Sequence, residues 1–500
     1  MNKRIMVDMS ATIIHHGHIR LLKKASEYGK VVVGLTTDDE ILNKKGYTPE
    51  LNFENRKEVL EAIKYVDEVV AVPWALDDKV LEKHNIDLLV HGDDNSNKIK
   101  KDKLLIFPRT EGVSSSDIRK KSSEIYINKQ NNIFDIWNKN KKRNILLNPG
   151  PATTTDSVKM AQVVPDICPR EQEFGNLMEY VSNELTKIVA SPQKYTTILF
   201  GGSGTAVVES TISSVIPHDK KVLIINNGSY GKRMCQIADA YGMKYIEFKS
   251  SPIKPINLKK LKKLIKENKD ISHLAVIHNE TTTGLLNNLD DLGKIAKKFN
   301  LEFIVDAMSS YSAIPINMKK QNIHYLLASS NKNIQGMAGI GFVIANVKSI
   351  EKLKNIKPRN FYLNLFAQYE NFISSHQMRF TPPVQTLYAL KQAIIETKKE
   401  GVKIRYKRYS KSWKTLTKFL KENNLKYLVK DKYHSRIITS IFIPENIDFN
   451  DLHDFFYEKG FTIYPGKVAN FNTFRIANIG EIDFKDMKKF LKLLKKYLGK

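Results

Sequence analysis

The chain has 500 residues, 42% of them hydrophobic, and its 80 lysines and arginines against 53 acidic residues give a formal net charge of +27. No apolar run approaches the ~18–20 residues of a membrane helix. The N-terminus shows no signal-peptide pattern, and the two cysteines, Cys168 and Cys235, form no C-x-x-C pair. These features argue against a membrane span, a disulfide framework and a structural zinc site, and they predict a cytoplasmic protein of roughly two to four domains.

Lysines supply most of the positive charge, and they lie mainly in helical stretches such as 257–269 and 485–500. Apolar residues recur there every three or four positions, so the lysines form the solvated faces of amphipathic helices. The alternative is a positive field that attracts phosphorylated or phosphonylated small molecules. Nucleic-acid binding is not expected, because no recognition motif accompanies the charge.

In residues 1–122, short apolar runs alternate with amphipathic patterns. The pattern predicts helices at 17–29 and 55–66, and strands at 4–8, 31–35, 66–72, 86–92 and 103–108. This alternation predicts an open, mostly parallel α/β sheet with helices on both faces, which is a Rossmann-like domain. Such sheets bind ligands at the carboxyl ends of their strands.

Residues 123–143 are polar, asparagine-rich and only weakly periodic, which indicates a linker with at most one short helix. From 144 to 500 the α/β alternation resumes, and several strands end in small or hydroxyl-bearing residues, as in "YTTILFGGSG" and "YLLASSNK". We predict a large α/β domain over about 160–375 and a smaller α+β lobe over about 376–500.

The string "HHGH" at residues 15–18 lies where a strand-end loop turns into a helix. Gly17 lets the backbone approach a ligand closely. The helix N-terminus offers N–H groups and the positive end of a dipole, and the imidazoles of His15 and His18 can donate to phosphate oxygens. Structural or surface histidines are the alternative explanation.

A second anion-receptive segment, "FPRTEGVSSSDIRKK", spans residues 107–121. Arg109 follows a strand, and the hydroxyl cluster Ser114–Ser116 precedes a predicted helix, although an ordinary helix cap would explain the cluster if it stood alone. Taken with "HHGHIRLLKKA", "RKEVLEAIKYVDEVV" and "HNIDLLVHGDD", the segment resembles the cytidylyltransferase family of nucleotidyltransferases, of the glycerol-3-phosphate type.

This resemblance implies roles for individual residues. His15 and His18 would stabilise the transition state at the α-phosphate of CTP and the departing pyrophosphate, with Mg²⁺ assisting. The other nucleotide- and phosphate-binding residues that it implies are Lys44, Arg56, Arg109, Gly112, Ser114 and Ser115. One segment departs from the family: "MSAT" stands where the glycerol-phosphate enzymes have "GTFD", so Thr12 replaces an aspartate and the acceptor cannot be inferred to be glycerol 3-phosphate.

The strongest single signal of a second chemical site is the segment "YLLASSNKNIQGMAG", residues 325–339. It places Lys332 at a strand end among hydroxyl groups, where a lysine can act as nucleophile and proton shuttle. In so lysine-rich a chain, a surface lysine is the default explanation. Other segments of the chain, however, supply residues that suit the same chemistry. Asp306 at a strand end can pair with a pyridinium nitrogen, Ser203–Thr205 can form a phosphate cup at a helix start, and Arg475 can grip a substrate anion.

This arrangement resembles the class V, fold-type I aminotransferases, which use pyridoxal 5'-phosphate, and among them the 2-aminoethylphosphonate–pyruvate transaminases. Matching strings include "HNETTTGLLN", "IVDAMSSYSAIP", "SSNKNIQG" and "YPGKV". The resemblance implies that Lys332 holds the coenzyme and moves a proton, that Asp306 pairs with the ring nitrogen, and that Arg475 binds phosphonate and carboxylate in turn. It also implies a homodimer or higher homo-oligomer, and coenzyme contacts from Ser203, Gly204, Thr205, Tyr230, Thr282, Ser330 and, in a second subunit, Thr381.

Together the two halves resemble fused phosphonate-tailoring enzymes. The second half would then convert phosphonoacetaldehyde and L-alanine to 2-aminoethylphosphonate and pyruvate, and the first half would couple that product to CTP. Candidate partners for the acceptor's amine are Asp8, Trp74 and Asp77. Two alternatives remain: a cytidylyltransferase for phosphocholine or glycerol 3-phosphate joined to an alanine- or serine-type transaminase, and a first half that only senses nucleotide. We expect no nucleic-acid or membrane partner.

Overall fold

The computed structural model describes residues 3–108, 110, 112–123, 144–466, 468 and 471–499. The chain divides into two compact units, Met1–Lys141 and Lys142–Lys500. Of the predicted linker, 123–143, only residue 123 is described, and the predicted ligand Arg109 also lies outside the described residues. None of the described helices is both long enough and apolar enough to cross a membrane.

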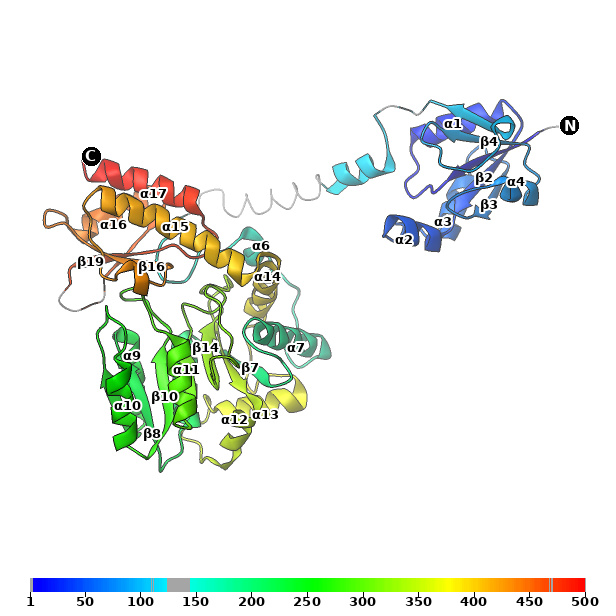
Figure 1. Ribbon diagram of the computed structural model, residues 1–500. Coiled ribbons are helices and arrows are strands. Elements are labelled where there is room, and N and C mark those ends of the chain that lie inside the picture. Colours follow the sequence, from blue (N-terminus) through cyan, green and yellow to red (C-terminus); the bar gives the residue numbers. More distant parts are fainter. Residues whose placement is uncertain are drawn as a thin grey trace. The chain divides into compact units, whose positions relative to one another are not determined.

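The first unit is built on a five-stranded parallel sheet with strand order β3-β2-β1-β4-β5. Its strands are β1 (Arg4–Met9), β2 (Lys30–Thr36), β3 (Glu68–Val72), β4 (Leu88–Gly92) and β5 (Leu104–Phe107). The connections hold α1 (His16–Ser26), α2 (Asp38–Lys45), α3 (Phe53–Glu61), α4 (Asp78–Lys83) and the 3₁₀ turn η1 (Lys101–Lys103), and residues 115–123 are helical (Figure 1). The predicted Rossmann-like α/β architecture is confirmed.

Strand β1 sets the position of the ligand site. Its side chains alternate between two hydrophobic clusters, with Ile5 and Val7 on one face of the sheet and Met6 on the other. The chain winds outward from β1 in both directions, through β2 and β3 on one side and β4 and β5 on the other. This reversal opens a crevice at the carboxyl ends of β1 and β4, where doubly wound sheets bind their ligands.

The second unit contains a seven-stranded sheet of order β7-β15-β14-β13-β10-β8-β9, in which only β15 runs antiparallel to its neighbours. Its strands are β7 (Tyr195–Gly201), β8 (Lys221–Asn226), β9 (Tyr245–Lys249), β10 (Ile271–Ile277), β13 (Glu302–Asp306), β14 (Tyr325–Ser329) and β15 (Ile340–Asn346). The strands are apolar on both faces because helices cover both, as Figure 1 shows. The first helical layer includes α7 (Gln172–Lys187), α10 (Leu258–Glu267), α11 (Leu289–Lys298) and α14 (Val384–Glu400), and the second includes α8 (Gly204–Val215), α9 (Ser229–Ala240) and α12 (Val347–Glu351).

A smaller lobe is formed by an antiparallel sheet of order β16-β19-β18 and three helices around their own apolar cluster. Its elements are α15 (Val402–Glu422), β16 (Ile438–Phe442), α16 (Phe449–Glu458), β18 (Tyr464–Pro465), β19 (Thr473–Ala477) and α17 (Phe484–Tyr497), and β6 (Ile145–Leu146) pairs with β17 (Phe461–Thr462) beside it. Although the smaller lobe was expected to start near residue 376, α14 packs against α6 (Asp156–Met160) and α7, because Leu387, Leu390 and Ile394 fill the core of the large sheet. The remaining elements of this unit are β11 (Asn279–Glu280), β12 (Leu285–Leu286), η2 (Lys352–Asn355), α13 (Leu365–Ser375) and η3 (Asp431–Tyr433).

Candidate active sites

The paired histidines are built into the start of α1. His15 is the N-cap residue, and its Nδ1 accepts a hydrogen bond from the backbone N–H of Gly17 at 3.2 Å. The Nδ1 of His18 accepts from the backbone N–H of His15 at 3.3 Å, which completes a capping box made of imidazoles. A ring nitrogen that accepts carries no proton, so each neutral ring carries its proton on Nε2, a donor suited to phosphate oxygens.

Close packing holds these rings in place. The centroids of the His15 and His18 rings lie 4.0 Å apart. A Cβ at Gly17 would approach the Nδ1 of His15 to 3.0 Å, which is tighter than ordinary contact. Glycine is therefore suited to this position for a steric reason.

The histidines face a cavity of about 780 Å³, whose walls include the carboxyl ends of β1, β2, β4 and β5. Ser114 and Ser115, predicted to bind nucleotide, also line it. The Ser114 hydroxyl accepts from the backbone N–H of Asp117 at 3.0 Å, and the Ser115 hydroxyl donates to the carbonyl of Ile13 at 3.0 Å. The second of these bonds ties the serine segment to the loop that precedes α1, so the two predicted anion-receptive segments share one site.

Arg56 was predicted to contact acceptor or phosphate, but it is fully buried in α3 and is not among the residues that line the cavity. Its guanidinium donates to the carbonyl of Ser10, donates to the carbonyl of Thr36 at 2.9 Å, and pairs with Asp38 at 2.6 Å. Ser10 and Thr36 do line the cavity. In this structure Arg56 therefore braces the cavity wall from behind, because its Nη1 and Nη2 donate to carbonyl groups at the ends of β1 and β2.

The predicted phosphate ligand Lys44 is exposed on α2 and does not line the cavity, whereas its neighbour Lys45 does. The Nζ of Lys45 donates to the Ser10 hydroxyl at 3.2 Å and lies 5.1 Å from the ring centroid of Trp74. One residue turns an α-helix by about 100°, which explains why adjacent lysines face different ways. Gly112 lies in an exposed turn and is not a lining residue.

Several further polar residues line the cavity, namely Asp8, Trp74, His91 and Asn97. Asp8 and Trp74 are two of the three candidates for binding an amine. The third, Asp77, instead caps α4 by accepting from the backbone N–H of Val80 at 3.1 Å. Sequence reasoning missed His91 and Asn97, although a polar residue directly after the apolar run 88–90 is a signal that could have found His91.

In the second unit, Lys332 follows β14 and faces the segment Pro149–Gly150. Its Nζ donates to the carbonyl oxygen of Pro149 at 2.9 Å. A Cβ at Gly150, whose φ is +129°, would lie 2.3 Å from that Nζ, so a larger residue would displace the amine. The predicted neighbour Ser330 is buried, and its hydroxyl donates to the carbonyl of Met337.

Asp306 ends β13 in a buried position. Burial raises the pKa of this carboxyl to about 6, against the opposing effects of the backbone N–H of Met308 and of the cations Arg233 and Lys332. A buried carboxylate gains from a further cationic partner, which a pyridinium N–H supplies.

The predicted phosphate cup opens α8. Ser203 is its N-cap residue and makes no side-chain cap hydrogen bond. The first N–H groups of a helix lack intrahelical acceptors, so this end can receive an anion. A Cβ at Gly204 would lie 2.6 Å from the Sδ of Met308, which brings the cup directly against the loop that follows Asp306.

Arg233, which sequence reasoning missed, connects two predicted residues. It donates to the Thr205 hydroxyl at 3.1 Å, and its guanidinium carbon lies 4.9 Å from the ring centroid of Tyr230. A cation therefore stands beside the cup, on a helix, α9, whose pattern gave no sign of it. Thr381, predicted to serve the site of a second subunit, is exposed in the single chain.

Arg475 lies in β19 and is 1% exposed. Its Nε donates to the carbonyl of Pro465 at 2.9 Å, and Nη1 donates to the carbonyl of Thr281 at 3.4 Å. The predicted Thr282 is also buried, and its hydroxyl donates to Glu280 at 2.6 Å. Burial raises the pKa of Glu280 to about 7, and this carboxyl is a further feature that sequence reasoning missed.

The donor set fits pyridoxal 5'-phosphate. It combines a lysine amine for which Gly150 leaves room, a buried carboxylate for the ring nitrogen and a helix start with hydroxyl groups for the phosphate. Lys332, Asp306 and Ser203–Thr205 would hold the coenzyme, which when bound supplies an electron sink.

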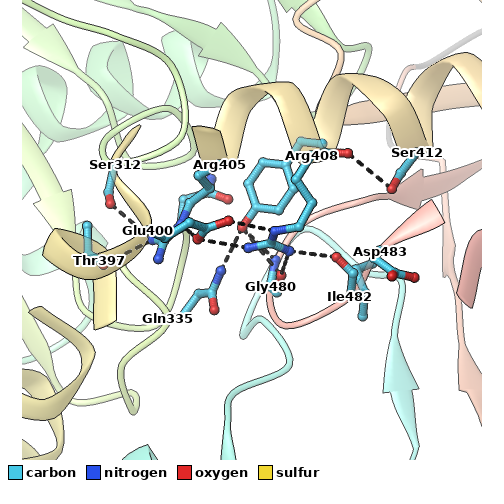
Figure 2. A network of polar contacts seen from close by, with 12 residues as sticks. Ser312, Gln335, Thr397, Glu400, Arg405, Arg408, Ser412, Gly480, Ile482 and Asp483 are labelled. Atoms are coloured by element: carbon cyan, nitrogen blue, oxygen red, sulfur yellow. Dashed lines mark hydrogen bonds and ion pairs between the residues drawn. The ribbon is translucent and has the colours of Figure 1, made fainter. Parts of the chain in front are cut away.

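A polar network centred on the buried Arg405, drawn in Figure 2, fastens the loop that carries Lys332 to α14 and α15. Arg405 donates to the carbonyl of Asn333 at 2.5 Å, to Ser312 at 3.2 Å and to Thr397 at 3.0 Å. Its Nε pairs with Glu400 at 2.7 Å. Glu400 also pairs with Arg408 at 2.7 Å, which in turn donates to the carbonyls of Gly480 and Ile482.

No three His, Cys, Asp or Glu side chains gather as metal ligands within the part of the chain that the structure describes. Magnesium bound mainly by substrate phosphates and water needs only one or two carboxylates. The expected Mg²⁺ therefore stays a prediction.

Comparison with known proteins gives matches for both units. Residues 10–121 match the family described as Cytidylyltransferase-like, and residues 158–477 match Aminotransferase class-V. The 2-aminoethylphosphonate–pyruvate transaminase of Bacillus cereus (strain G9842) is 40% identical over 356 residues, which cover 70% of this chain and 97% of that protein. The bifunctional phosphonoacetaldehyde hydrolase/aminoethylphosphonate transaminase of Clostridioides difficile (strain 630) is 39% identical over 361 residues, which cover 71% of this chain and 56% of that protein.

Solved structures share the fold of the second unit. Alanine–glyoxylate aminotransferase from Nostoc sp. matches with a TM-score of 0.67 at 24% identity, over 71% of this chain and 95% of that one. Pyridoxamine–pyruvate aminotransferase from Mesorhizobium loti matches with a TM-score of 0.67 at 20% identity, over 72% and 92%. The predicted combination of a pyridoxal-phosphate transaminase with a nucleotidyltransferase domain is confirmed, and the chain belongs to the class-V aminotransferase family, preceded by a cytidylyltransferase-like domain.

Proposed function

We propose that the chain makes CMP-2-aminoethylphosphonate in two successive reactions. The second unit transfers the amino group of L-alanine to phosphonoacetaldehyde and yields 2-aminoethylphosphonate and pyruvate. In the first unit, a phosphonate oxygen of that product attacks the α-phosphorus of CTP, and the bond from this phosphorus to pyrophosphate breaks. The observation that carries the proposal is the union, in one chain, of 40% identity to a 2-aminoethylphosphonate–pyruvate transaminase with a cytidylyltransferase-like domain whose paired histidines face a cavity.

In the transamination, Lys332 would hold the coenzyme and move the proton of the substrate carbon that bears the amine, using the Nζ that now donates to Pro149. Asp306 would keep the positive charge of the ring nitrogen in place. Arg475 would bind the phosphonate of one substrate and the carboxylate of the other in turn, since a guanidinium can accept either anion through paired hydrogen bonds. Tyr230 and Thr282 remain candidate contacts, as does Thr381 from a second subunit, and a homodimer is part of the proposal.

In the nucleotidyl transfer, the Nε2–H groups of His15 and His18 would donate to the α-phosphate and to the departing pyrophosphate. The N-terminus of α1 adds its own N–H groups at the same place. Donors fixed by a capping box need no rearrangement as charge develops, which is the basis of electrostatic stabilisation of a transition state. Lys45, Ser114 and Ser115 support this role from the cavity wall. Arg109, Lys44, Gly112 and Mg²⁺ remain proposed contributors.

One incubation tests the proposal. The full chain, saturated with pyridoxal 5'-phosphate, is mixed with phosphonoacetaldehyde, L-alanine, CTP and Mg²⁺ and followed by ³¹P NMR. We expect a phosphonate–phosphate anhydride signal with one pyrophosphate per anhydride, and pyruvate equal to the sum of the anhydride and the uncoupled 2-aminoethylphosphonate. Without alanine the anhydride should be absent, and added 2-aminoethylphosphonate should restore it.

Competing acceptors give the same experiment its second arm. Phosphocholine and glycerol 3-phosphate test the alternative that the first unit activates a phosphate monoester. Coupling of either in place of 2-aminoethylphosphonate would refute the proposal in favour of that alternative. Tight CTP binding without any pyrophosphate release would instead indicate a domain that only senses nucleotide.

A further inference from the structure

Asp8 carries an incompletely paired carboxylate at the end of β1. It lines the cavity, its side chain is 12% exposed, and its Oδ2 accepts from the Nδ2 of Asn97 at 3.0 Å. Its Oδ1 is buried and has no hydrogen-bond partner among the described residues. A buried carboxylate oxygen without a donor is costly, and burial indeed raises the pKa of Asp8.

The imidazole of His91 faces this oxygen. The Nε2 of His91 lies 3.6 Å from Oδ1 of Asp8, beyond normal hydrogen-bond length. The Nδ1 of His91 lies 3.0 Å from the carbonyl oxygen of Gly92, and only a protonated nitrogen bonds to a carbonyl. In the neutral ring Nε2 is therefore an acceptor, so two acceptors lie 3.6 Å apart. An ammonium on the cavity side can donate one N–H to each of them. Asp94, 3.7 Å from the other ring nitrogen, adds negative charge.

The other two candidates for an amine are already engaged. The face of Trp74 carries the Lys45 ammonium at 5.1 Å from the ring centroid. The carboxylate of Asp77 caps α4 and does not line the cavity. Among the three, Asp8 alone combines a place in the cavity wall with an oxygen that lacks a donor.

We propose that Asp8, with His91, binds the ammonium group of a zwitterionic acceptor whose phosphonate lies toward His15 and His18. This inference rests on the proposed function and specifies how the first unit selects its acceptor. The cavity is suited to both charges, because its lining holds Asp8 and Asp94 as well as the cationic Arg20, Lys24 and Lys45. The acceptor's ammonium must carry N–H groups, since a quaternary ammonium has charge but no N–H to donate to the two acceptors.

The test compares three acceptors in the wild-type full chain and in Asp8→Asn: 2-aminoethylphosphonate, its N,N,N-trimethyl analogue, and ethylphosphonate, which has no amine. In the wild type, kcat/KM for 2-aminoethylphosphonate should exceed that for each of the other two by about 10- to 100-fold, the range for one charge-assisted hydrogen bond. Asp8→Asn should lower only the first value, by a similar factor. Its KM for CTP should stay unchanged.

Asp39→Asn is the matched control, because it makes the same charge change on the exposed side of α2, outside the cavity lining. It should leave all three acceptors unaffected. The wild-type acceptor series also decides the matter if Asp8→Asn fails to fold: equal turnover of all three acceptors would overturn the inference. So would an equal loss of all three in a folded Asp8→Asn, the pattern expected if Asp8 only pairs with a charged His91. A wild type that couples none of these acceptors to CMP refutes the proposed function itself, whereas coupling without discrimination refutes only this inference.

Discussion

Replacing Arg405 by Met should destabilise the second unit and loosen the loop that carries Lys332. Arg405 is 2% exposed, and removing its guanidinium leaves the buried carbonyl of Asn333 without its donor. Breaking a buried ion pair typically costs about 3–5 kcal/mol. In the variant, Glu400 still has its ion pair with Arg408 at 2.7 Å, and its side chain is 21% exposed. We therefore expect a loss at the low end of this range, about 3 kcal/mol of the free energy of unfolding.

Urea unfolding of the full chain, followed by circular dichroism, measures this loss. Lys414→Met is the control, because Lys414 lies exposed on the same helix and should change the free energy of unfolding by less than about 0.5 kcal/mol. Because Asn333 directly follows Lys332, the dissociation constant for pyridoxal 5'-phosphate should rise in Arg405→Met under conditions where the variant is folded. Arg405→Lys should recover part of the stability but not the bonds to several acceptors at once.

The reasoning would be refuted if Arg405→Met and Lys414→Met had equal stability and equal coenzyme affinity. A loss of stability with unchanged coenzyme affinity would limit the network of Figure 2 to a structural role.

Two further predictions concern the candidate sites, and a third concerns His278, a buried histidine directly after β10. Lys332→Ala should abolish the visible absorbance of protein-bound coenzyme and stop pyruvate formation, while the coupling of added 2-aminoethylphosphonate to CTP continues; retained absorbance would contradict the assignment of Lys332. His18→Ala should slow pyrophosphate release by about 10²–10³-fold, as expected for loss of one donor to the transition state, and should leave pyruvate formation unchanged. A rate of pyrophosphate release equal to that of the wild type would argue against this role. Burial lowers the pKa of His278 to about 3, whereas the ordinary value is 6.5. The unfolded chain therefore gains its proton first as pH falls, so the free energy of unfolding should drop below pH 6.5 by up to ~1.4 kcal/mol per pH unit for this group. Urea titrations at several pH values should show a shallower slope in His278→Asn, and identical slopes would contradict this account.

Sequence alone located both candidate sites because their signals are local. A run of apolar residues that ends in polar or small ones identifies a strand and its carboxyl end, and in a parallel sheet all such ends lie at one edge. This logic brought the segments of His15 and Ser114 to one cavity, and it set Lys332 and Asp306 on the ends of the adjacent strands β14 and β13. The resemblance to known families added the individual roles.

Only the tertiary structure decided which neighbouring side chain faces the ligand space. Lys45 rather than Lys44 lines the cavity because the rotation of α2 about its axis is set by packing. Arg56 lies behind the wall because it meets carbonyl groups 20 and 46 residues away in the sequence. Asp8 and His91 come to face each other because they lie on β1 and β4, two strands that pair only in the folded chain. Local pattern therefore indicated where each candidate site lies. Contacts between distant segments determined which side chains line it, because no sequence period encodes the angle at which packed elements meet.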